Sequence, residues 1–304
     1  MKNLMDQVET NASVRALLAE IVDYAGLFPP SQLPMGEAVA NYAAYLKSRY
    51  KWMLGRFVVP VARLSEFAEH AAESFETSSD VWKLSVLASD AIDETVENIA
   101  AFNRRYTGKA IIDALEVKAD TVLEIENIAV HLPENLTVYF ELPLDEKLAE
   151  SVITLAIAKH RAKIRTGGIT PEAFPPIEKI TRFMRICLAA NVPFKCTAGL
   201  HHPLRALKSL TYEANAPIGR MNGFLNVFVA AAFLQQGYAP KLIHELLKDE
   251  RADNFQFRAD GVLWRQEYFA HTTQLKFLRE HGIISFGSCS FVEPIEDLQE
   301  IELL

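Results

Sequence analysis

The chain alternates short runs of β-branched and aromatic residues with longer segments of helical spacing. This alternation is typical of strand-helix units around a parallel sheet. Eight such units over 304 residues favour an α/β fold, a (β/α)8 barrel of the TIM type, and the doubly wound open sheet is the alternative. The predicted strands are a short one reaching Leu27 and Phe28, then 52–60, 82–89, 110–116, 136–142, 161–166, 193–198 and 283–291.

We interpret residues 1–304 as a single barrel domain, because no segment rich in Pro, Gly or Ser divides the chain. An N-terminal helix is predicted after a cap at Asn11 or Ser13. Residues 203–282 separate the seventh and eighth strands and contain several helical patterns, which indicates a helical insertion. Within it, the segment 223–237 is apolar almost all round and predicts a buried helix or a subunit contact, which would make the protein a homo-oligomer.

The composition narrows the class of partner. The net charge is −8 and no basic block occurs, so neither nucleic acid nor a membrane surface is expected as a partner. The three cysteines form no Cys-x-x-Cys pair, and we find no signal peptide and no apolar run of membrane-spanning length, which favours a cytoplasmic protein. No glycine-rich nucleotide motif is present. We therefore expect a small-molecule ligand and no cofactor.

Charged side chains gather at the predicted carboxyl ends of the strands, which form the active face of such a barrel. Side chains on a strand alternate between its faces, so Lys163 and Arg165 point the same way, as do Lys195 and Thr197. Apolar Ile164 suits the helix-covered side, which leaves the cations inside the barrel. Acidic candidates on the same face are Asp113, Glu116 and Glu141, and the following loop adds His201 and His202.

Interior cations are costly unless they are paired or open to solvent, and two interpretations account for them. In the first, Glu116 and Glu141 pair with the lysines as a structural ion network. In the second, Arg165 and Lys195 lower the pKa of Lys163, so that its neutral amine attacks a ketone or aldehyde and forms a Schiff base. One of the acidic candidates would then move the protons.

Three motifs resemble the last strand ends of the deoxyribose-phosphate aldolase family, a class I group of (β/α)8 enzymes: KIRTGG at 163–168, FKCTAGL at 194–200 and SFGSCSF at 285–291. The resemblance implies that Lys163 forms the Schiff base and that Lys195 tunes it. It further implies a strand-four aspartate at Asp113. Phosphate binding would fall on Gly199 in the loop after strand seven and on the turn Gly287-Ser288 after strand eight.

The chain also departs from that family. Arg165 stands where the family carries a small hydroxyl residue, Ala198 replaces a glycine, and the 203–282 insertion is foreign to it. Because a guanidinium binds carboxylates and phosphates in bidentate fashion, we expect a small carboxylated or phosphorylated carbonyl compound held by Arg165 instead of a deoxyribose phosphate.

Other functions are compatible with the same residues. The cations could clamp an anionic substrate without covalent chemistry, as in barrel phosphoribosyltransferases. Alternatively, Glu116, Glu141 and the two histidines could bind a divalent ion that stabilises an enolate. Adjacent histidines are not a usual chelating spacing, so we predict no metal. A barrel that binds a ligand without catalysis is the non-enzyme alternative.

The two histidines after strand seven have a chemical and a structural interpretation. His201 could act as an acid or base, with His202 contacting substrate. Structurally, one would pack against the insertion and the other would cap a helix. Cys289 lies beside the last turn with no base placed near it by the sequence, which indicates a packed thiol. The favoured prediction is a class I aldolase-like lyase.

Overall fold

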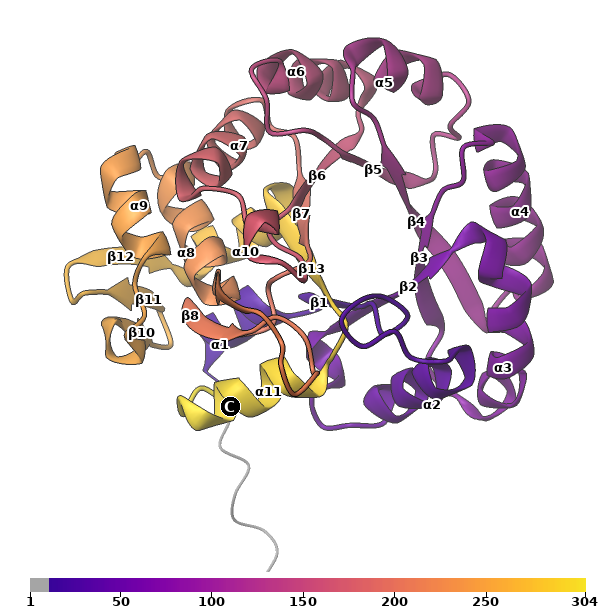
Figure 1. Ribbon diagram of the computed structural model, residues 1–304, viewed down its shortest axis with the longest axis horizontal. Helices are drawn as coiled ribbons and strands as arrows, with labels where there is room; N and C mark the ends of the chain where they lie inside the picture. Colours follow the sequence, from indigo (N-terminus) through magenta and orange to yellow (C-terminus); the bar gives the residue numbers. More distant parts are fainter. Residues whose placement is uncertain (1–10) are drawn as a thin grey trace, which may run out of the picture.

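A computed structural model describes residues 11–304, and in it eight parallel strands close into a barrel with the helices outside the ring (Figure 1). The strands are β1 (Val22–Tyr24), β2 (Leu54–Pro60), β3 (Trp82–Leu87), β4 (Ala110–Lys118), β5 (Thr137–Glu141), β6 (Arg161–Arg165), β7 (Phe194–Thr197) and β13 (Ile283–Ser288). The predicted (β/α)8 barrel is confirmed. The open-sheet alternative is wrong, because β1 pairs with both β13 and β2 and closes the ring.

The first strand lies earlier than predicted. Its three residues pair with β13 and β2, whereas Leu27 and Phe28 follow in a turn. In that turn the Ala25 N–H donates to the Ser288 carbonyl, and the Phe28 N–H donates to the Ala25 carbonyl. Leu27 is buried there without any strand partner. A short apolar run therefore indicated burial correctly but not strand pairing.

The helices cover the outside of the barrel, and none within residues 11–304 has the length and apolarity needed to cross a membrane. The N-terminal helix α1 begins after Asn11, whose side chain accepts a hydrogen bond from the Ser13 N–H, as predicted. The helices are α1 (Ala12–Leu18), α2 (Met35–Leu46), α3 (Leu64–Thr77), α4 (Ile92–Arg105), α5 (Val122–Ala129), α6 (Leu148–Ala158), α7 (Ile177–Ala189), α8 (Phe224–Gln235), α9 (Pro240–Leu247), α10 (Thr272–His281) and α11 (Val292–Glu300).

The insertion between β7 and β13 is not purely helical, which corrects the prediction. Besides α8, α9 and α10 it contains an antiparallel pair, β8 (Ala206–Ser209) with β9 (Ile218–Met221). It also contains a three-stranded sheet of β10 (Phe255–Phe257), β11 (Gly261–Trp264) and β12 (Tyr268–His271). These strands have only three or four residues, which is too short for a two-residue period to stand out in the sequence.

The helix α8 is buried on all sides, which confirms the first of the two interpretations of the segment 223–237, a buried helix. It packs against the barrel, where the rings of Phe224 and Phe286 stack with centroids 5.0 Å apart. An aromatic stack of this kind adds to the free energy gained from burying the two rings. The helix therefore anchors the insertion to the last strand of the barrel.

Candidate active site

A cavity of about 260 Å³ opens at the carboxyl ends of the barrel strands. The strand register explains why charged groups gather there, because Lys163 lies directly opposite Lys195 on β7 and directly opposite Glu141 on β5. Residues opposite each other on neighbouring strands point to the same face. The polar groups and turn residues in its wall include Glu116, Lys163, Arg165, Lys195, Thr197, His201, Gly287 and Cys289.

Glu116 joins the two lysines. Its Oε2 lies 2.7 Å from Lys163 Nζ, and its Oε1 lies 2.7 Å from Lys195 Nζ. The Ser85 hydroxyl donates a further hydrogen bond to Oε1. Burial would raise the pKa of Glu116, but the two ammonium groups hold it well below its usual range. The cavity floor therefore carries a permanent carboxylate shared by two amines.

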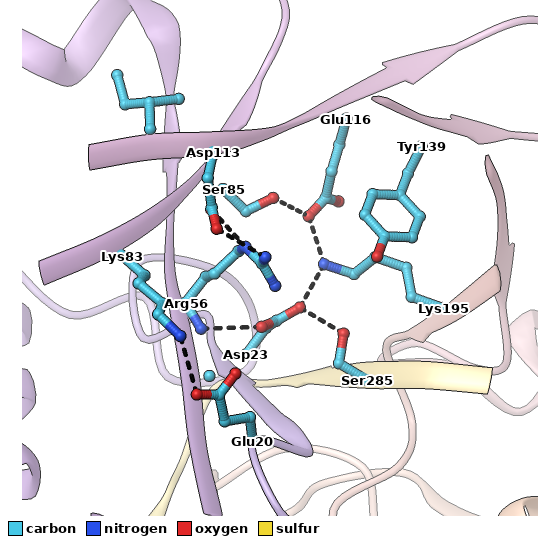
Figure 2. A network of polar contacts seen from close by, with 12 residues as sticks. Glu20, Asp23, Arg56, Lys83, Ser85, Asp113, Glu116, Tyr139, Lys195 and Ser285 are labelled. Atoms are coloured by element: carbon cyan, nitrogen blue, oxygen red, sulfur yellow. Dashed lines mark hydrogen bonds and ion pairs between the residues drawn. The ribbon is translucent and has the colours of Figure 1, made fainter. Parts of the chain in front are cut away.

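Lys195 has a second carboxylate partner, Asp23, whose Oδ2 lies 2.5 Å from the amine (Figure 2). Asp23 is itself held by the Ser285 hydroxyl and by the Arg56 N–H, which donate to its two oxygens. Burial would lower the pKa of Lys195, but the charges of Asp23 and Glu116 raise it above its ordinary value. Lys195 is therefore fixed as an ammonium ion.

Lys163 has a different second partner. Its amine lies 2.9 Å from Glu141 Oε2, and Arg165 approaches the other oxygen of Glu141 at 4.0 Å. The side chain of Arg165 is 58% exposed, so its guanidinium is free to reach a ligand. Three carboxylates thus face three cations in this cluster, counting Asp23 and Glu116 with Glu141. The ion network is therefore present, and Lys163 belongs to it while it also lines the cavity.

Asp113 is not brought together with the lysines. It lies toward the amino end of β4, where its two oxygens accept hydrogen bonds from Arg56 at 2.6 and 2.8 Å (Figure 2). Burial would lower the pKa of Arg56, but the hydrogen bond to Asp113 raises it. The carboxylate next to both amines on this strand is Glu116, three residues later. The resemblance implied a carboxylate at Asp113 in the site, but the structure pairs Asp113 with Arg56 instead.

The two histidines after β7 have different surroundings. His201 lines the cavity, and its Nδ1 lies 3.3 Å from Ser288 Oγ and 3.3 Å from Glu293 Oε2. Burial works against a charged ring, but contacts with Cys289 and Glu293 raise the pKa of His201 to about 9. His202 instead binds Asp297 on α11 and does not line the cavity. One histidine thus faces the site and the other fastens the loop to a helix.

The loops around Gly199 are tightly packed. Gly199 has a φ of +73°, and a Cβ there would lie 2.7 Å from Gly167 Cα. The Thr166 hydroxyl donates to the Ala198 carbonyl at 2.6 Å, which ties the loops after β6 and β7 together. Gly199 and Ser288 do not line the cavity, whereas Thr197 and Gly287 do. The first pair therefore shapes the wall from behind.

The residues of the metal alternative do not converge. Glu116 and Glu141 bind lysines, and the two histidines face Glu293 and Asp297. Within residues 11–304, no group of three or more His, Cys, Asp or Glu side chains is arranged to hold a metal ion.

Sequence reasoning did not find several partners of the site. The sequence patterns do not predict that Asp23 pairs with Lys195, that Ser85 donates to Glu116 or that Ser285 donates to Asp23. Glu293 beside His201 was also missed. Alternation on the strands could have placed Ser85 inside the barrel, but the partner of each group depends on the depth of its side chain in the barrel.

Comparisons with known proteins add little beyond the fold. A scan against protein-family models finds no match. A search of curated proteins finds none either. Six chains of solved structures match, among them one described as "Structure of a novel GH10 endoxylanase retrieved from sugarcane soil metagenome". It is 9% identical over 89% of this chain and 100% of that chain, with a TM-score of 0.38.

Proposed function

We propose that the protein is a lyase of the class I aldolase type, in which Lys163 forms a Schiff base with a small anionic carbonyl compound. One observation carries the proposal: the amine of Lys163 lies in a cavity wall and shares the carboxylate of Glu116 with a second, permanently charged amine. A lysine acts as a nucleophile through its neutral amine, so its proton must first pass to a neighbouring base.

The surroundings of the two lysines support different roles for them. Lys195 lies between two buried carboxylates and is 1% exposed, so it keeps its proton and acts as a fixed charge. Lys163 is bound by Glu116 and by Glu141, whose side chain is 18% exposed. Glu141 is thus the acceptor best placed to take the proton of Lys163, because solvent reaches it.

The proposed reaction begins when Lys163 loses a proton to Glu141. The neutral amine adds to the carbonyl carbon, and the resulting carbinolamine loses its hydroxyl as water, with a proton supplied by Glu141 or His201. Glu141, a carboxylate again, then takes the proton of the hydroxyl on the β-carbon of the substrate. The Cα–Cβ bond breaks, its electron pair passes to the iminium to give an enamine, and the leaving fragment becomes a carbonyl. Protonation of the enamine carbon and hydrolysis return the free lysine.

The anionic group of the substrate is assigned to Arg165, which lines the cavity and is largely exposed. A guanidinium binds a carboxylate or phosphate through two parallel N–H groups. Thr197 and Gly287 line the same wall, where they contact the substrate directly. Gly199, His202 and Ser288 hold this wall in place and do not contact the substrate.

Borohydride trapping tests the proposal. The protein is incubated with a panel of keto acids and aldehydes, reduced and digested, and the modified residue is located by mass spectrometry. We expect an adduct on Lys163 that K163M abolishes. The matched control is K276M, which removes an exposed lysine on α10 and should leave trapping unchanged. An absence of any adduct across the panel, or the same adduct in K163M, would exclude Schiff-base chemistry at Lys163.

The same panel separates the proposal from its alternative. The ion pairs of Lys163 and Lys195 would also suit a barrel that clamps an anion without covalent chemistry. In that case calorimetry would detect binding of an anionic compound in wild type, no adduct would form, and R165M would abolish the binding.

A further inference from the structure

One of the three cysteines differs from the others in its surroundings. Cys187 and Cys196 are fully buried in the core, and burial raises the pKa of both thiols. Cys289, directly after β13, lies instead in the wall of the cavity. A thiol that borders a cavity can meet a ligand, whereas a thiol enclosed by apolar side chains cannot.

Polar groups from two different parts of the chain contact this thiol. His201 Nδ1, in the loop after β7, lies 3.9 Å from Cys289 Sγ. The hydroxyl of Tyr212, in the loop between β8 and β9, lies 3.7 Å from the same sulfur. The thiol is therefore in contact with a base on one side and a hydroxyl on the other, and neither contact is expected for a cysteine that only fills space.

An acid lies beside the base. Glu293 Oε2, in the first turn of α11, lies 3.3 Å from His201 Nδ1, the nitrogen that also approaches Cys289, and Ser288 Oγ lies at the same distance. A carboxylate next to an imidazole favours the imidazolium. Burial would raise the pKa of the Cys289 thiol, but the hydrogen bond and charge of His201 lower it.

We propose that Cys289, with His201 as its proton donor, is a second nucleophile of the cavity and captures small carboxylated aldehydes as reversible hemithioacetals. The thiolate sulfur forms a bond to the aldehyde carbon. The π pair of the carbonyl moves to its oxygen, which takes the proton of the His201 imidazolium. The reverse sequence releases the aldehyde and restores both groups, so no oxidant or other reactant takes part.

The cavity accounts for this class of ligand. Arg165 lines it with a largely exposed guanidinium that attracts an anionic compound, while the sulfur supplies a soft nucleophile for its carbonyl carbon. An aldehyde is preferred over a ketone because the second carbon substituent of a ketone crowds the attacked atom. The capture does not depend on the Schiff base at Lys163, so the two chemistries can be tested separately.

Alkylation with iodoacetamide tests the reactivity of the thiol. Under native conditions, peptide mapping should show Cys289 modified at least about tenfold faster than Cys187 and Cys196, which serve as internal controls. H201Q should slow the modification of Cys289 by about tenfold, and E293Q should slow it less. Equal rates at the three cysteines, or an unchanged rate in folded H201Q, would contradict a thiol activated by His201.

NMR of bound aldehyde tests the capture itself. Glyoxylate labelled with ¹³C at its aldehyde carbon is added to K163M, in which no imine can form at Lys163. We expect a protein-bound tetrahedral carbon signal that disappears in K163M/C289S and in K163M/C289A. The proposal is overturned if K163M shows no such signal or if the signal persists without Cys289. Neither result bears on the Schiff base, which is tested separately by the borohydride adduct on Lys163 of the wild-type protein.

Discussion

Lys195 and Asp23 form an ion pair of 2.5 Å although their strands, β7 and β1, do not pair with each other. The strand β13 lies between them in the ring, and its Ser285 donates to the same Asp23 oxygen. The contact thus crosses the interior of the closed barrel and joins residues 172 positions apart. The charge on Lys195 is consequently a property of the complete ring, not of any single strand-helix unit.

Replacing the shared carboxylate should destabilise the protein strongly. E116Q leaves two buried ammonium groups without their common partner, and breaking a buried ion pair in this way costs about 3–5 kcal/mol. The matched control is E20Q, which removes an exposed partner of Lys83 and should cost at most about 1 kcal/mol. Urea unfolding compares the two, and equal losses would contradict the central position of Glu116.

Alanine at Gly199 should cost more than alanine at Gly108. Both glycines have positive φ, +73° and +79°, so both substitutions introduce backbone strain of about 1 kcal/mol or more. Only at Gly199 does the new Cβ also meet backbone, 2.7 Å from Gly167 Cα, whereas Gly108 has nothing within 4 Å. Denaturant unfolding should therefore show a larger loss for G199A. A similar loss for both would mean that the loop shifts freely.

Removing the Arg165 guanidinium should affect anionic ligands selectively. Charge-assisted hydrogen bonds contribute about 1.5–3 kcal/mol, so R165M should weaken glyoxylate binding by roughly 10- to 100-fold. Glycolaldehyde, which carries no charge, should be trapped on Lys163 equally well by wild type and R165M. For each aldehyde, the measurement is the concentration that gives half-maximal trapping, compared between R165M and the wild type. A parallel loss for both aldehydes would instead indicate that Arg165 supports the structure of the site.

Stability should fall as the charge of His201 is lost. Its pKa is about 9 in the folded protein and near 6.5 in an unfolded chain, so folding favours the protonated ring. The stabilisation is complete below about pH 6.5 and disappears as the pH rises through about 9. From about pH 6.5 to about pH 9, the melting temperature should fall more for a protein with His201 than for the H201Q variant.

That pH experiment needs a background without the neighbouring thiol. The lowered pKa of Cys289 acts in the opposite direction, since its stabilisation is lost as the pH falls through the folded value. Comparing C289S with C289S/H201Q removes this contribution. Glu293 still raises the pKa of His201 there, but by less than in the wild type, because contact with Cys289 is the larger cause, so the decrease should come at a lower pH. The same decrease in melting temperature in both variants would show that another group titrates.

The strand pattern was sufficient to predict the barrel and the meeting of Lys163 with Lys195, because both follow from local alternation and from the order of neighbouring strands. The partner of Lys195 was not predictable in this way. Whether Asp23 reaches across the interior depends on the stagger of the strands, which determines the depth of each side chain in the barrel. Sequence spacing contains no direct measure of that stagger.

The surroundings of Cys289 were predicted incompletely for another reason. The strands β7 and β13 are neighbours, so the loop bearing His201 could have been expected beside Cys289. The second contact, from Tyr212, comes from the insertion, whose small sheets have strands too short to recognise. The prediction of a merely packed thiol thus failed to consider the base that the strand order brings to it.

The sharing of Glu116 between two amines has a consequence for the proposed chemistry. A protonated imine carries the same single positive charge as the ammonium ion it replaces, at nearly the same atom. The ionic surroundings of Glu116 are therefore the same before and after condensation, and the interior stays electroneutral while bonds to nitrogen are exchanged. A centre arranged in this way needs almost no dielectric reorganisation to accommodate its own intermediate.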